Sequence, residues 1–224
     1  RRQRQMCIRD SGKNVTLTLD LDLQTYVQQK LEKAKANSKA KSAEAVVLDA
    51  ATGQVLAMAN TGTIDPNKDI EKQLEKDKTF DNLAVSHPFE PGSVAKIITA
   101  AATIEEGLTN PDEVLQVPGS IDMAGVTVND AWPHGVEPYT TTGVFGKSSN
   151  VGTLMLADRL GQDKYADYLK KFGLGQTSGI ELPNESPGLV PDRSQWSGGT
   201  FANLPIGQGQ SWTALQLASI YQTL

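Results

Sequence analysis

The chain has 224 residues, of which 38% are hydrophobic and 21% charged, and its formal net charge at pH 7 is −5. This apolar content allows a substantial core, but no stretch approaches the roughly 18 consecutive apolar residues of a membrane span. The mild negative charge argues against nucleic acid as the main partner. The single cysteine, Cys7, excludes an internal disulfide framework and a cysteine-based metal cluster.

Both ends of the sequence differ from an ordinary domain terminus. Residues 1–11 (RRQRQMCIRDS) are basic and lack apolar periodicity. They resemble a translated sequencing-adapter remnant, with a native basic arm as the alternative, so we expect 1–13 to be a non-native or disordered tail. Residues 214–224 have the pattern of a helix without a cap or a following tail. We therefore expect the chain to be a fragment cut at both ends.

The first elements after this tail are a strand and a helix. Residues 14–19 alternate polar and apolar side chains, which predicts a short strand. Asp20 or Asp22 can cap the helix that follows, where apolar residues recur every four positions at Leu23, Val27 and Leu31. The Ala-, Lys- and Ser-rich stretch 33–41 is expected to fray into a loop.

A hairpin and a charged segment come next. Residues 44–49 and 54–59 are β-prone runs on either side of Gly53, which can supply the left-handed turn position of a hairpin. Residues 65–78 are dense in charge, which is typical of a solvated loop or helix.

A serine and a lysine begin the next helix. Pro91 and Gly92 favour a turn, and the apolar run after them favours a helix from about residue 93. Ser93 would then lie at the helix N-terminus with Lys96 on the same face, because residues i and i+3 are neighbours there. A desolvated lysine can take the proton of a serine nucleophile. Taken alone, this spacing also occurs by chance in many helices.

The second half alternates loops with helices. Residues 110–140 are rich in Pro and Gly, which predicts an irregular segment with short strands such as 126–128; such segments are often functional. Residues 140–147 predict a short helix. Longer helices are expected over 151–160 and over 163–172, the second ending before Gly173. Residues 183–199 read as another loop.

Ser148 and Asn150 lie just before one of these helices. In an extended turn both side chains would point to the same side, where a hydroxyl and an amide could relay a proton and bind a substrate amide. The alternative for Ser148-Ser149-Asn150 is helix capping, a frequent role of these residue types.

Ser-x-x-Lys followed downstream by Ser-x-Asn resembles the active-site pattern of penicillin-binding proteins and serine β-lactamases. The resemblance extends to class B penicillin-binding proteins over most of 14–224, and 143–155 resembles the cell-division transpeptidase of actinobacteria. The stretches that carry it are 18–24 (TLDLDLQ), 47–58 (VLDAATGQVLAM), 89–93 (FEPGS), 143–155 (GVFGKSSNVGTLM), 206–209 (IGQG) and 215–218 (LQLA).

This resemblance implies a fold and a domain assignment. The fold class is α+β, a serine β-lactamase/D,D-peptidase-like fold in which helices pack on an antiparallel sheet. Residues 14–224 would form a partial penicillin-binding transpeptidase domain, with the last strands of the sheet missing from the chain.

The resemblance also implies a reaction, a peptidoglycan D,D-transpeptidation in septal cell-wall synthesis. Ser93 would attack the penultimate D-Ala of a D-Ala-D-Ala stem peptide and form an acyl-enzyme, and β-lactams would acylate it as substrate mimics. Lys96, neutral through burial, would take the Ser93 proton. Ser148 would pass a proton to the leaving nitrogen, and Asn150 would hold Lys96 and a substrate amide. The Ser93 backbone N–H would form half of an oxyanion hole.

One departure from the family is clear. The third family motif, Lys-Thr/Ser-Gly, does not occur in the sequence. Its strand supplies the other oxyanion donor, so we expect the 224 residues to be weakly active or inactive. The family also implies a membrane anchor outside this chain, an extracytoplasmic location, and cell-division proteins and a glycosyltransferase as partners.

The remaining candidate residues predict little chemistry. His87 and His134 lack the neighbours of a metal site, and no metal or cofactor is implied. Trp132 could line the substrate cleft, although packing is the commoner role.

Two other functions stay open. A β-lactamase or D,D-carboxypeptidase would need efficient water attack on the acyl-enzyme, and no clear Glu-x-x-x-Asn motif is visible. A non-catalytic β-lactam-sensing or divisome scaffold domain would keep Ser93 without crosslinking.

Overall fold

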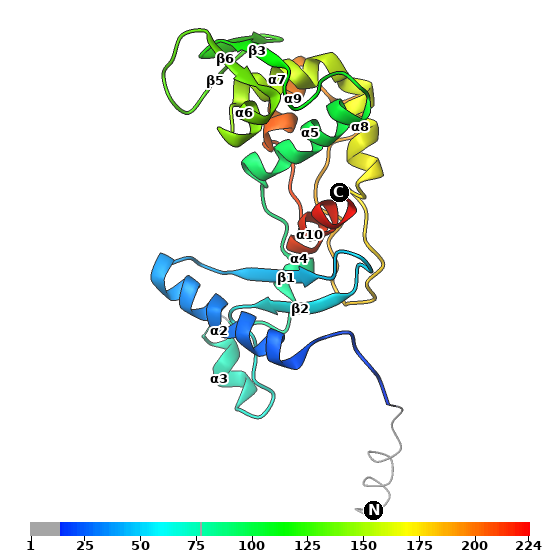
Figure 1. The fold of residues 1–224 in the computed structure, drawn as a ribbon. Coiled ribbons are helices and arrows are strands. Elements are labelled where there is room, and N and C mark those ends of the chain that lie inside the picture. Colours follow the sequence, from blue (N-terminus) through cyan, green and yellow to red (C-terminus); the bar gives the residue numbers. More distant parts are fainter. Residues whose placement is uncertain (1–13, 77) are drawn as a thin grey trace, which may run out of the picture.

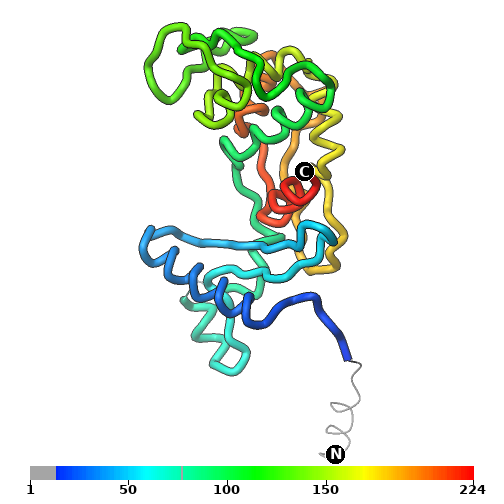
Figure 2. The backbone as a smooth tube through the Cα atoms, in the orientation of Figure 1, coloured from blue at the N-terminus to red at the C-terminus, as the bar shows by residue number. Residues whose placement is uncertain are grey.

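The computed structural model describes residues 14–76 and 78–224, which form a lower and an upper body joined by extended connections (Figure 1). The lower body is a hairpin of β1 (Glu44–Leu48) and β2 (Val55–Asn60) with α2 (Leu21–Ser38) and α3 (Ile70–Leu74) beside it. The tube in Figure 2 shows several connections passing between the two bodies, among them the segments near residue 90 and near residue 210. The α+β architecture predicted from the sequence is confirmed.

Helix α2 is longer than the sequence predicted. Asp20 caps it by accepting a hydrogen bond from the Leu23 N–H at 2.8 Å. The expected loop over 33–41 is wrong, because the helix continues to Ser38 and ends at Lys39, whose φ is 55°. Ala and Lys are strong helix formers, which favours the helix over this stretch.

The predicted strand over 14–19 is also wrong. Only two hydrogen bonds join this region to β2: from Thr18 Oγ1 to the Val55 carbonyl at 2.6 Å and from the Asp20 N–H to the Leu56 carbonyl at 2.9 Å. A strand needs a repeated ladder of backbone bonds. The alternating pattern therefore gives an extended segment beside β2 with no strand pairing.

The side-chain amide of Gln24 couples α2 to β2. It accepts a hydrogen bond from the Met58 N–H at 2.8 Å and donates one to the Met58 carbonyl at 2.9 Å. We expect Gln24→Ala to lower the free energy of unfolding by about 2 kcal/mol, because both backbone groups lose a partner. Urea unfolding measures this loss. Gln29→Ala, on an exposed part of the same helix, is the control, and an equal loss in both variants would contradict the coupling.

The hairpin and the last helix follow the sequence prediction. β1 and β2 pair antiparallel with Val46 opposite Met58, and Gly53 has the left-handed φ of 71° that the turn requires. Helix α10 (Ala214–Thr223) packs on β1, and Gln222 Nε2 donates to the Ala50 carbonyl at 3.0 Å. The C-terminal helix thereby ties the turn of the lower hairpin to the segment that leads from the upper body.

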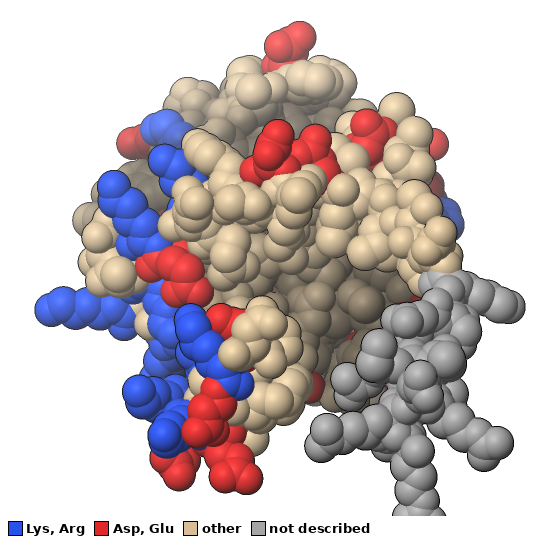
Figure 3. Space-filling view, turned by 90° about the horizontal axis from the view of Figure 1, so that it is seen from below, with Lys and Arg blue, Asp and Glu red and all other residues tan. Residues whose placement is uncertain are grey.

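The charged segment 65–78 is mostly solvated over its described residues, as expected. It contains the short helix α3, capped by Asp69, and ion pairs join Lys68 to Asp65 at 3.1 Å and Lys72 to Asp69 at 3.5 Å. Seen from below, Lys and Arg side chains and some acidic ones gather along one side of the molecule (Figure 3). Exposed pairs of this kind add little stability.

The upper body is built around α5 (Lys96–Glu105), α7 (Asn150–Leu160) and α8 (Gln162–Lys171). α5 packs against both of the others, and α9 (Gly198–Asn203) completes this layer. Fully buried side chains between these elements include Ile98, Ala157, Tyr165, Leu204 and Trp212. Helices α7 and α8 were predicted nearly at their observed bounds, and Gly173 follows α8 with a φ of 77°.

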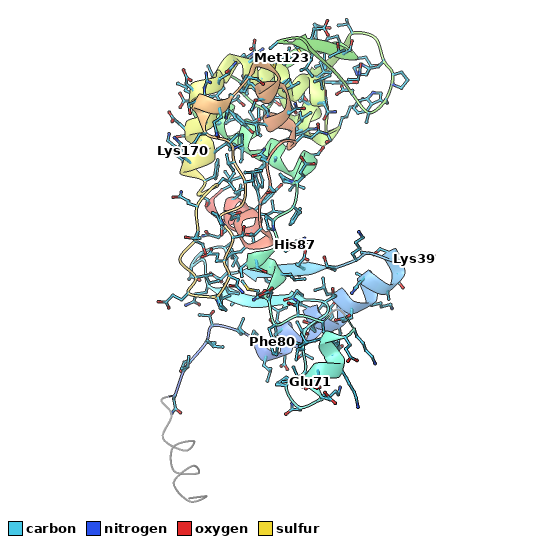
Figure 4. All side chains as sticks on the ribbon, turned by 180° about the vertical axis from the view of Figure 1, so that it is seen from behind. Lys39, Glu71, Phe80, His87, Met123 and Lys170 are labelled. Carbon is cyan, nitrogen blue, oxygen red and sulfur yellow. The ribbon has the colours of Figure 1, made fainter. Side chains whose placement is uncertain are left out.

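Residues 110–140 contain more strand than the sequence predicted. β3 (Val114–Val117) pairs with β6 (Glu137–Thr140), and β4 (Ser120–Met123) pairs with β5 (Val126–Asn129). Of these four strands, only β5 was predicted at specific residues. Figure 4 places Met123, at the end of β4, at the far end of the upper body. The short helix α6 (Thr141–Gly146) follows β6, as predicted.

The two bodies meet near α4 (Leu83–Ser86), which contacts β1, β2 and α10. His87 follows α4 at this junction (Figure 4), and its Nδ1 lies 3.3 Å from Glu44 Oε1. The expected loop over 183–199 is mostly irregular, with a 3₁₀ turn at Arg193–Gln195. The tail predicted over 1–13 lies outside the described residues.

Candidate active site

Ser93 lies where the sequence predicted, at the start of a helix. It belongs to the 3₁₀ turn Gly92–Ala95, and α5 continues directly from this turn at Lys96. The Ser93 side chain is exposed, whereas Pro91 and Ala95 on either side are buried. We find no hydrogen bond of the Ser93 hydroxyl among the described residues. The hydroxyl is therefore accessible, and the Ser93 N–H lies at the start of the helical turn, where backbone N–H groups have no intrahelical partner.

The turn before Ser93 is braced by the segment 207–212. The Phe89 and Trp212 backbones exchange two hydrogen bonds of 2.9 Å, and the Gly92 N–H donates to the Gly207 carbonyl at 3.1 Å. Glu90 Oε1 also accepts from the Gly209 N–H at 2.9 Å. Two segments far apart in sequence thus hold the backbone on which Ser93 sits.

Lys96 is the buried cation of the site. The residue is only 3% exposed, and its Nζ donates to the Ser148 carbonyl at 2.6 Å and to Ser148 Oγ at 3.0 Å. Burial lowers the pKa of Lys96 from 10.5 to about 8, and the negative charge of Asp130 partly opposes this. Roughly a tenth of the Lys96 amines are therefore neutral at pH 7.

Ser148 holds Lys96 through an unusual backbone conformation. The sequence suggested an extended turn, but Ser148 has a φ of 58° and Asn150 is already the first residue of α7. The left-handed conformation occurs at a position where both the carbonyl and the hydroxyl of Ser148 bind Lys96 Nζ. Such strain persists where surrounding contacts over-determine the backbone.

The left-handed conformation of Ser148 predicts that two substitutions at this position differ in their free energy of unfolding. Ser148→Gly and Ser148→Ala both remove the hydroxyl, but only glycine adopts a positive φ without strain. We expect Ser148→Gly to unfold with a free energy about 1 kcal/mol higher than that of Ser148→Ala. The same pair at Ser219, inside α10, should reverse this order. Urea titrations in which alanine is the more stable at both sites would contradict the strain.

The capping role considered for this motif belongs to its middle residue. Ser149 is the N-cap of α7, and its buried Oγ accepts a hydrogen bond from the Gly152 N–H at 2.8 Å. Capping and contact with Lys96 are therefore divided between Ser149 and Ser148. The two interpretations of the sequence are compatible.

Asn150 makes a different contact from the one the sequence implied. Its Nδ2 donates to the Asn129 carbonyl at 3.0 Å. Within the described residues, no hydrogen bond joins Asn150 to Lys96. Asn150 thus lies in the same turn as Ser148, which binds Lys96, and its amide nitrogen is bound to the end of β5.

Trp132 both packs and lines a hollow. Its ring stacks on His134 with centroids 5.4 Å apart, and Lys147 Nζ lies 5.8 Å from the ring centroid. It also lines a hollow of about 400 Å³ together with Asn129 and Asp130. The hollow adjoins the backbone that binds Asn150, which is compatible with the predicted position beside a cleft.

Sequence reasoning missed Asp130. This buried carboxylate accepts hydrogen bonds from Ser149 Oγ at 2.7 Å and from the Val151 N–H at 3.0 Å. The sequence offers only a weak indication of this residue, because Asn129 and Asp130 are simply two polar residues directly after the β-prone run 126–128. Pattern alone did not reveal that this strand ends beside α7.

The structure gives no sign of a metal centre or a membrane span in the part that it describes. Among residues 14–76 and 78–224 there is no group of three or more His, Cys, Asp or Glu side chains arranged to hold a metal ion. Within the same residues, none of the helices has the length and apolar character needed to cross a bilayer.

Comparison with known proteins identifies close relatives. The family described as "Penicillin binding protein transpeptidase domain" matches residues 43–224. Penicillin-binding protein PbpB of Mycobacterium tuberculosis is 65% identical over 213 residues, which is 95% of this chain and 31% of the relative. Peptidoglycan D,D-transpeptidase FtsI of Escherichia coli is 35% identical over 214 residues, 94% of this chain and 35% of the relative. The chain spans about a third of the length of these relatives.

Solved structures agree with this result. Penicillin-binding protein 3 from M. tuberculosis, in complex with aztreonam, matches with a TM-score of 0.92 and 65% identity over 95% of this chain and 47% of that chain. The same protein in complex with ampicillin matches equally well. The fold that the sequence resemblance predicted is confirmed.

Proposed function

The chain belongs to the penicillin-binding protein transpeptidase family, and on that premise we propose that it carries the nucleophile and the base of a division-type peptidoglycan D,D-transpeptidase. One observation carries the proposal. The buried Lys96 Nζ binds both the carbonyl and the hydroxyl of Ser148, a residue 52 positions away, and it does so three residues after the exposed Ser93.

The first half-reaction forms the acyl-enzyme. Ser93 Oγ attacks the carbonyl carbon of the penultimate D-Ala, and the Ser93 proton passes to neutral Lys96 Nζ. The new ester bond forms as the C–N bond to the last D-Ala breaks. Ser148 Oγ, hydrogen-bonded to Lys96, passes its proton to the leaving nitrogen and receives one from Lys96, which becomes neutral again. The Ser93 N–H donates to the developing oxyanion.

The second half-reaction forms the crosslink. An amine of a neighbouring stem peptide attacks the ester carbonyl and loses a proton to neutral Lys96, and Lys96 returns that proton to Ser93 Oγ as the ester C–O bond breaks. The product is a new amide bond between two stem peptides. Asn150 and Trp132 contact the donor peptide.

β-Lactams acylate the same serine. The M. tuberculosis protein described above forms complexes with aztreonam and ampicillin. In this chain the Ser93 hydroxyl opens the lactam ring in the position of the peptide carbonyl, and the ring nitrogen takes the proton from Ser148. The resulting ester is long-lived when water has poor access to it.

Mass spectrometry tests this function directly. After incubation with fluorescent penicillin and digestion with trypsin, the label should appear on the peptide 79–96, which contains both Ser86 and Ser93. Fragmentation should place it on Ser93. Label confined to Ser86 or to another peptide would refute the assignment.

The lifetime of the adduct separates the transpeptidase from the enzymatic alternatives. A transpeptidase keeps the label for many minutes after free penicillin is removed. Rapid loss of label with release of penicilloic acid would instead support a β-lactamase, and release of D-Ala from stem peptides without crosslinks would support a carboxypeptidase. For the scaffold alternative, cells that divide with Ser93→Ala as their sole copy would be the supporting result.

The missing third motif has a measurable consequence. The sequence contains no Lys-Thr-Gly or Lys-Ser-Gly, so one oxyanion donor of the family is absent and acylation of the 224 residues alone should be slow. We expect a version extended by a segment that carries this motif to label about a hundred times faster. Equal rates would show that these residues need no second donor.

The location and the partners of the whole protein extend this proposal. A transpeptidase that crosslinks stem peptides works on the extracytoplasmic face of the cell membrane. Cell-division proteins and a glycosyltransferase that supplies nascent glycan strands are its partners there. Crosslinking in dividing cells through a photoreactive residue at exposed sites of this chain would test these contacts.

A further inference from the structure

The carboxylate of Asp130 is a buried charge to which the proposed reaction assigns no role. β4 and β5 form a hairpin that ends at Asn129, and Asp130 follows with a side chain that is 0% exposed. A buried carboxylate is expensive unless it is fully hydrogen-bonded. Its partners therefore indicate what it does.

The hydrogen bonds from this strand end to the start of α7 fall on three consecutive residues. Asp130 Oδ2 accepts from Ser149 Oγ at 2.7 Å, and Oδ1 accepts from the Val151 N–H at 3.0 Å. Between them, the Asn129 carbonyl accepts from Asn150 Nδ2 at 3.0 Å. The first turn of α7, directly after Ser148, is thus fixed to the end of β5.

His134 fixes the carboxylate from the other side. Its Nε2 lies 3.1 Å from Asp130 Oδ2, and because a carboxylate only accepts, Nε2 carries the proton. The imidazole is almost fully buried and packs between the rings of Trp132 and Tyr139, with centroid distances of 5.4 and 5.9 Å. Lys147 Nζ lies 4.4 Å from the Tyr139 ring centroid. The aromatic cluster leaves the Asp130 carboxylate little freedom to move.

Asp130 also interacts electrostatically with Lys96. The negative charge favours the ammonium form of Lys96 and so opposes the lowering of its pKa by burial. His134 lies against Asp130, and Lys147 lies over the neighbouring rings. Among the described residues, Asp130 is the charged group that acts appreciably on Lys96.

We propose that Asp130 is a positioning residue for the acylation of Ser93: it fixes the first turn of α7 and thereby the Ser148 carbonyl and hydroxyl that hold Lys96. This inference rests on the proposed function. Hydrogen bonds to Ser149 and Val151 set the geometry, and His134 holds the carboxylate in place. Asp130 itself touches neither Ser93 nor a substrate.

Asp130→Asn tests the role, because it keeps the shape of the side chain and removes its charge. We expect the limiting rate of penicillin acylation at high pH to fall about tenfold, since Ser148 loses its fixed position. We also expect the midpoint of the rate–pH profile to move to lower pH by about half a unit, because the charge that favours the Lys96 ammonium is gone. A residue important only for packing would lower stability and leave that midpoint unchanged.

Two further variants separate charge from geometry. Ser149→Ala breaks the 2.7 Å bond to Asp130 but keeps the carboxylate, so the limiting rate should fall while the midpoint stays near that of the wild type. Asp122→Asn makes the same chemical change at an exposed position of the same hairpin, and neither quantity should change. Ser149→Ala also covers the case in which Asp130→Asn does not fold.

A second readout distinguishes failure of this inference from failure of the proposed function. Titration of the Lys96 ε-carbon by NMR reports its pKa without any acylation. A version extended by a segment that carries the third motif and that never acylates Ser93 would contradict the proposed function, whereas a lowered Lys96 pKa in Asp130→Asn would still support the contact. An unchanged Lys96 pKa together with an unchanged limiting rate in Asp130→Asn would overturn the positioning role.

Discussion

Replacing Lys96 by methionine is expected to slow acylation of Ser93 by a β-lactam by about a thousandfold. Methionine fills a similar volume but cannot accept the serine proton, and general bases contribute about a hundredfold to ten-thousandfold. Lys96→Arg should be as slow, because a guanidinium does not deprotonate at these pH values. Stopped-flow or gel-based labelling measures the rates. Ser93→Ala gives the background without acylation, and Lys170→Met, on the exposed surface of α8, is the control whose rate should not change.

The pH dependence of the acylation rate follows from the burial of Lys96. Lys96 acts when neutral, and its pKa is lowered from 10.5 to about 8. The rate should therefore rise about tenfold from pH 7 to pH 9 and then level off. With an unshifted pKa the neutral fraction at pH 7 would be about 300 times smaller. A rate that stays flat between pH 7 and 9, or that falls, would contradict the assignment of Lys96 as the base.

The lowered pKa also has a consequence for stability. Between pH 8 and about 10.5 the unfolded chain keeps the Lys96 proton while the folded chain has lost it, so stability rises with pH across this window. Below pH 8 both states are protonated, and the buried ammonium destabilises the folded state. The stability difference between wild type and Lys96→Met should therefore change between pH 8 and 10.5 in favour of the wild type. This measurement of unfolding reports the burial of Lys96 independently of its role in acylation.

Local patterns were sufficient for the nucleophile and for the elements around it. Pro91 and Gly92 before an apolar run correctly predicted Ser93 at a helix start, and the hairpin turn at Gly53 was equally clear. These signals are local because the steric preferences of proline and glycine act within a few residues. The family resemblance placed Lys96 and Ser148 in one site but assigned the contact with Lys96 to Asn150, whereas the structure shows it at Ser148. No local pattern brings together residues 52 positions apart.

The errors have a common physical cause in tertiary contacts. Residues 14–19 alternate like a strand but lack a partner that offers a full ladder of hydrogen bonds. Conversely, the Pro- and Gly-rich stretch 110–140 pairs into β3–β6 and β4–β5 in spite of its composition. Asp130 was missed for the same reason, because its importance depends on where the second of these hairpins meets α7. Strand pairing depends on neighbours that a single segment does not reveal.

Outside the Ser-x-x-Lys and Ser-x-Asn motifs, Gly207 is the position where one added methyl group should lower stability and labelling the most. Its φ is 83°, and a Cβ built there would lie 1.9 Å from the Gly92 carbonyl oxygen. The neighbour is backbone, so a rotamer change cannot relieve the overlap. The same Gly92 donates its N–H to the Gly207 carbonyl at 3.1 Å and directly precedes Ser93. An added side chain must therefore push apart the two segments that hold the nucleophile.

We expect Gly207→Ala to lower the free energy of unfolding by about 3–5 kcal/mol, combining left-handed strain with the backbone clash, and to abolish measurable labelling of Ser93. Gly209→Ala is a matched control two residues away. Gly209 has a φ of 72° but no atom within 4 Å of its built Cβ, so it should cost only about 1 kcal/mol and keep most of the labelling. The difference between the two variants isolates the clash with Gly92 from the strain that both share. Equal losses would show that the brace between residues 92 and 207 yields easily, and that the position of Ser93 is set by α5 alone.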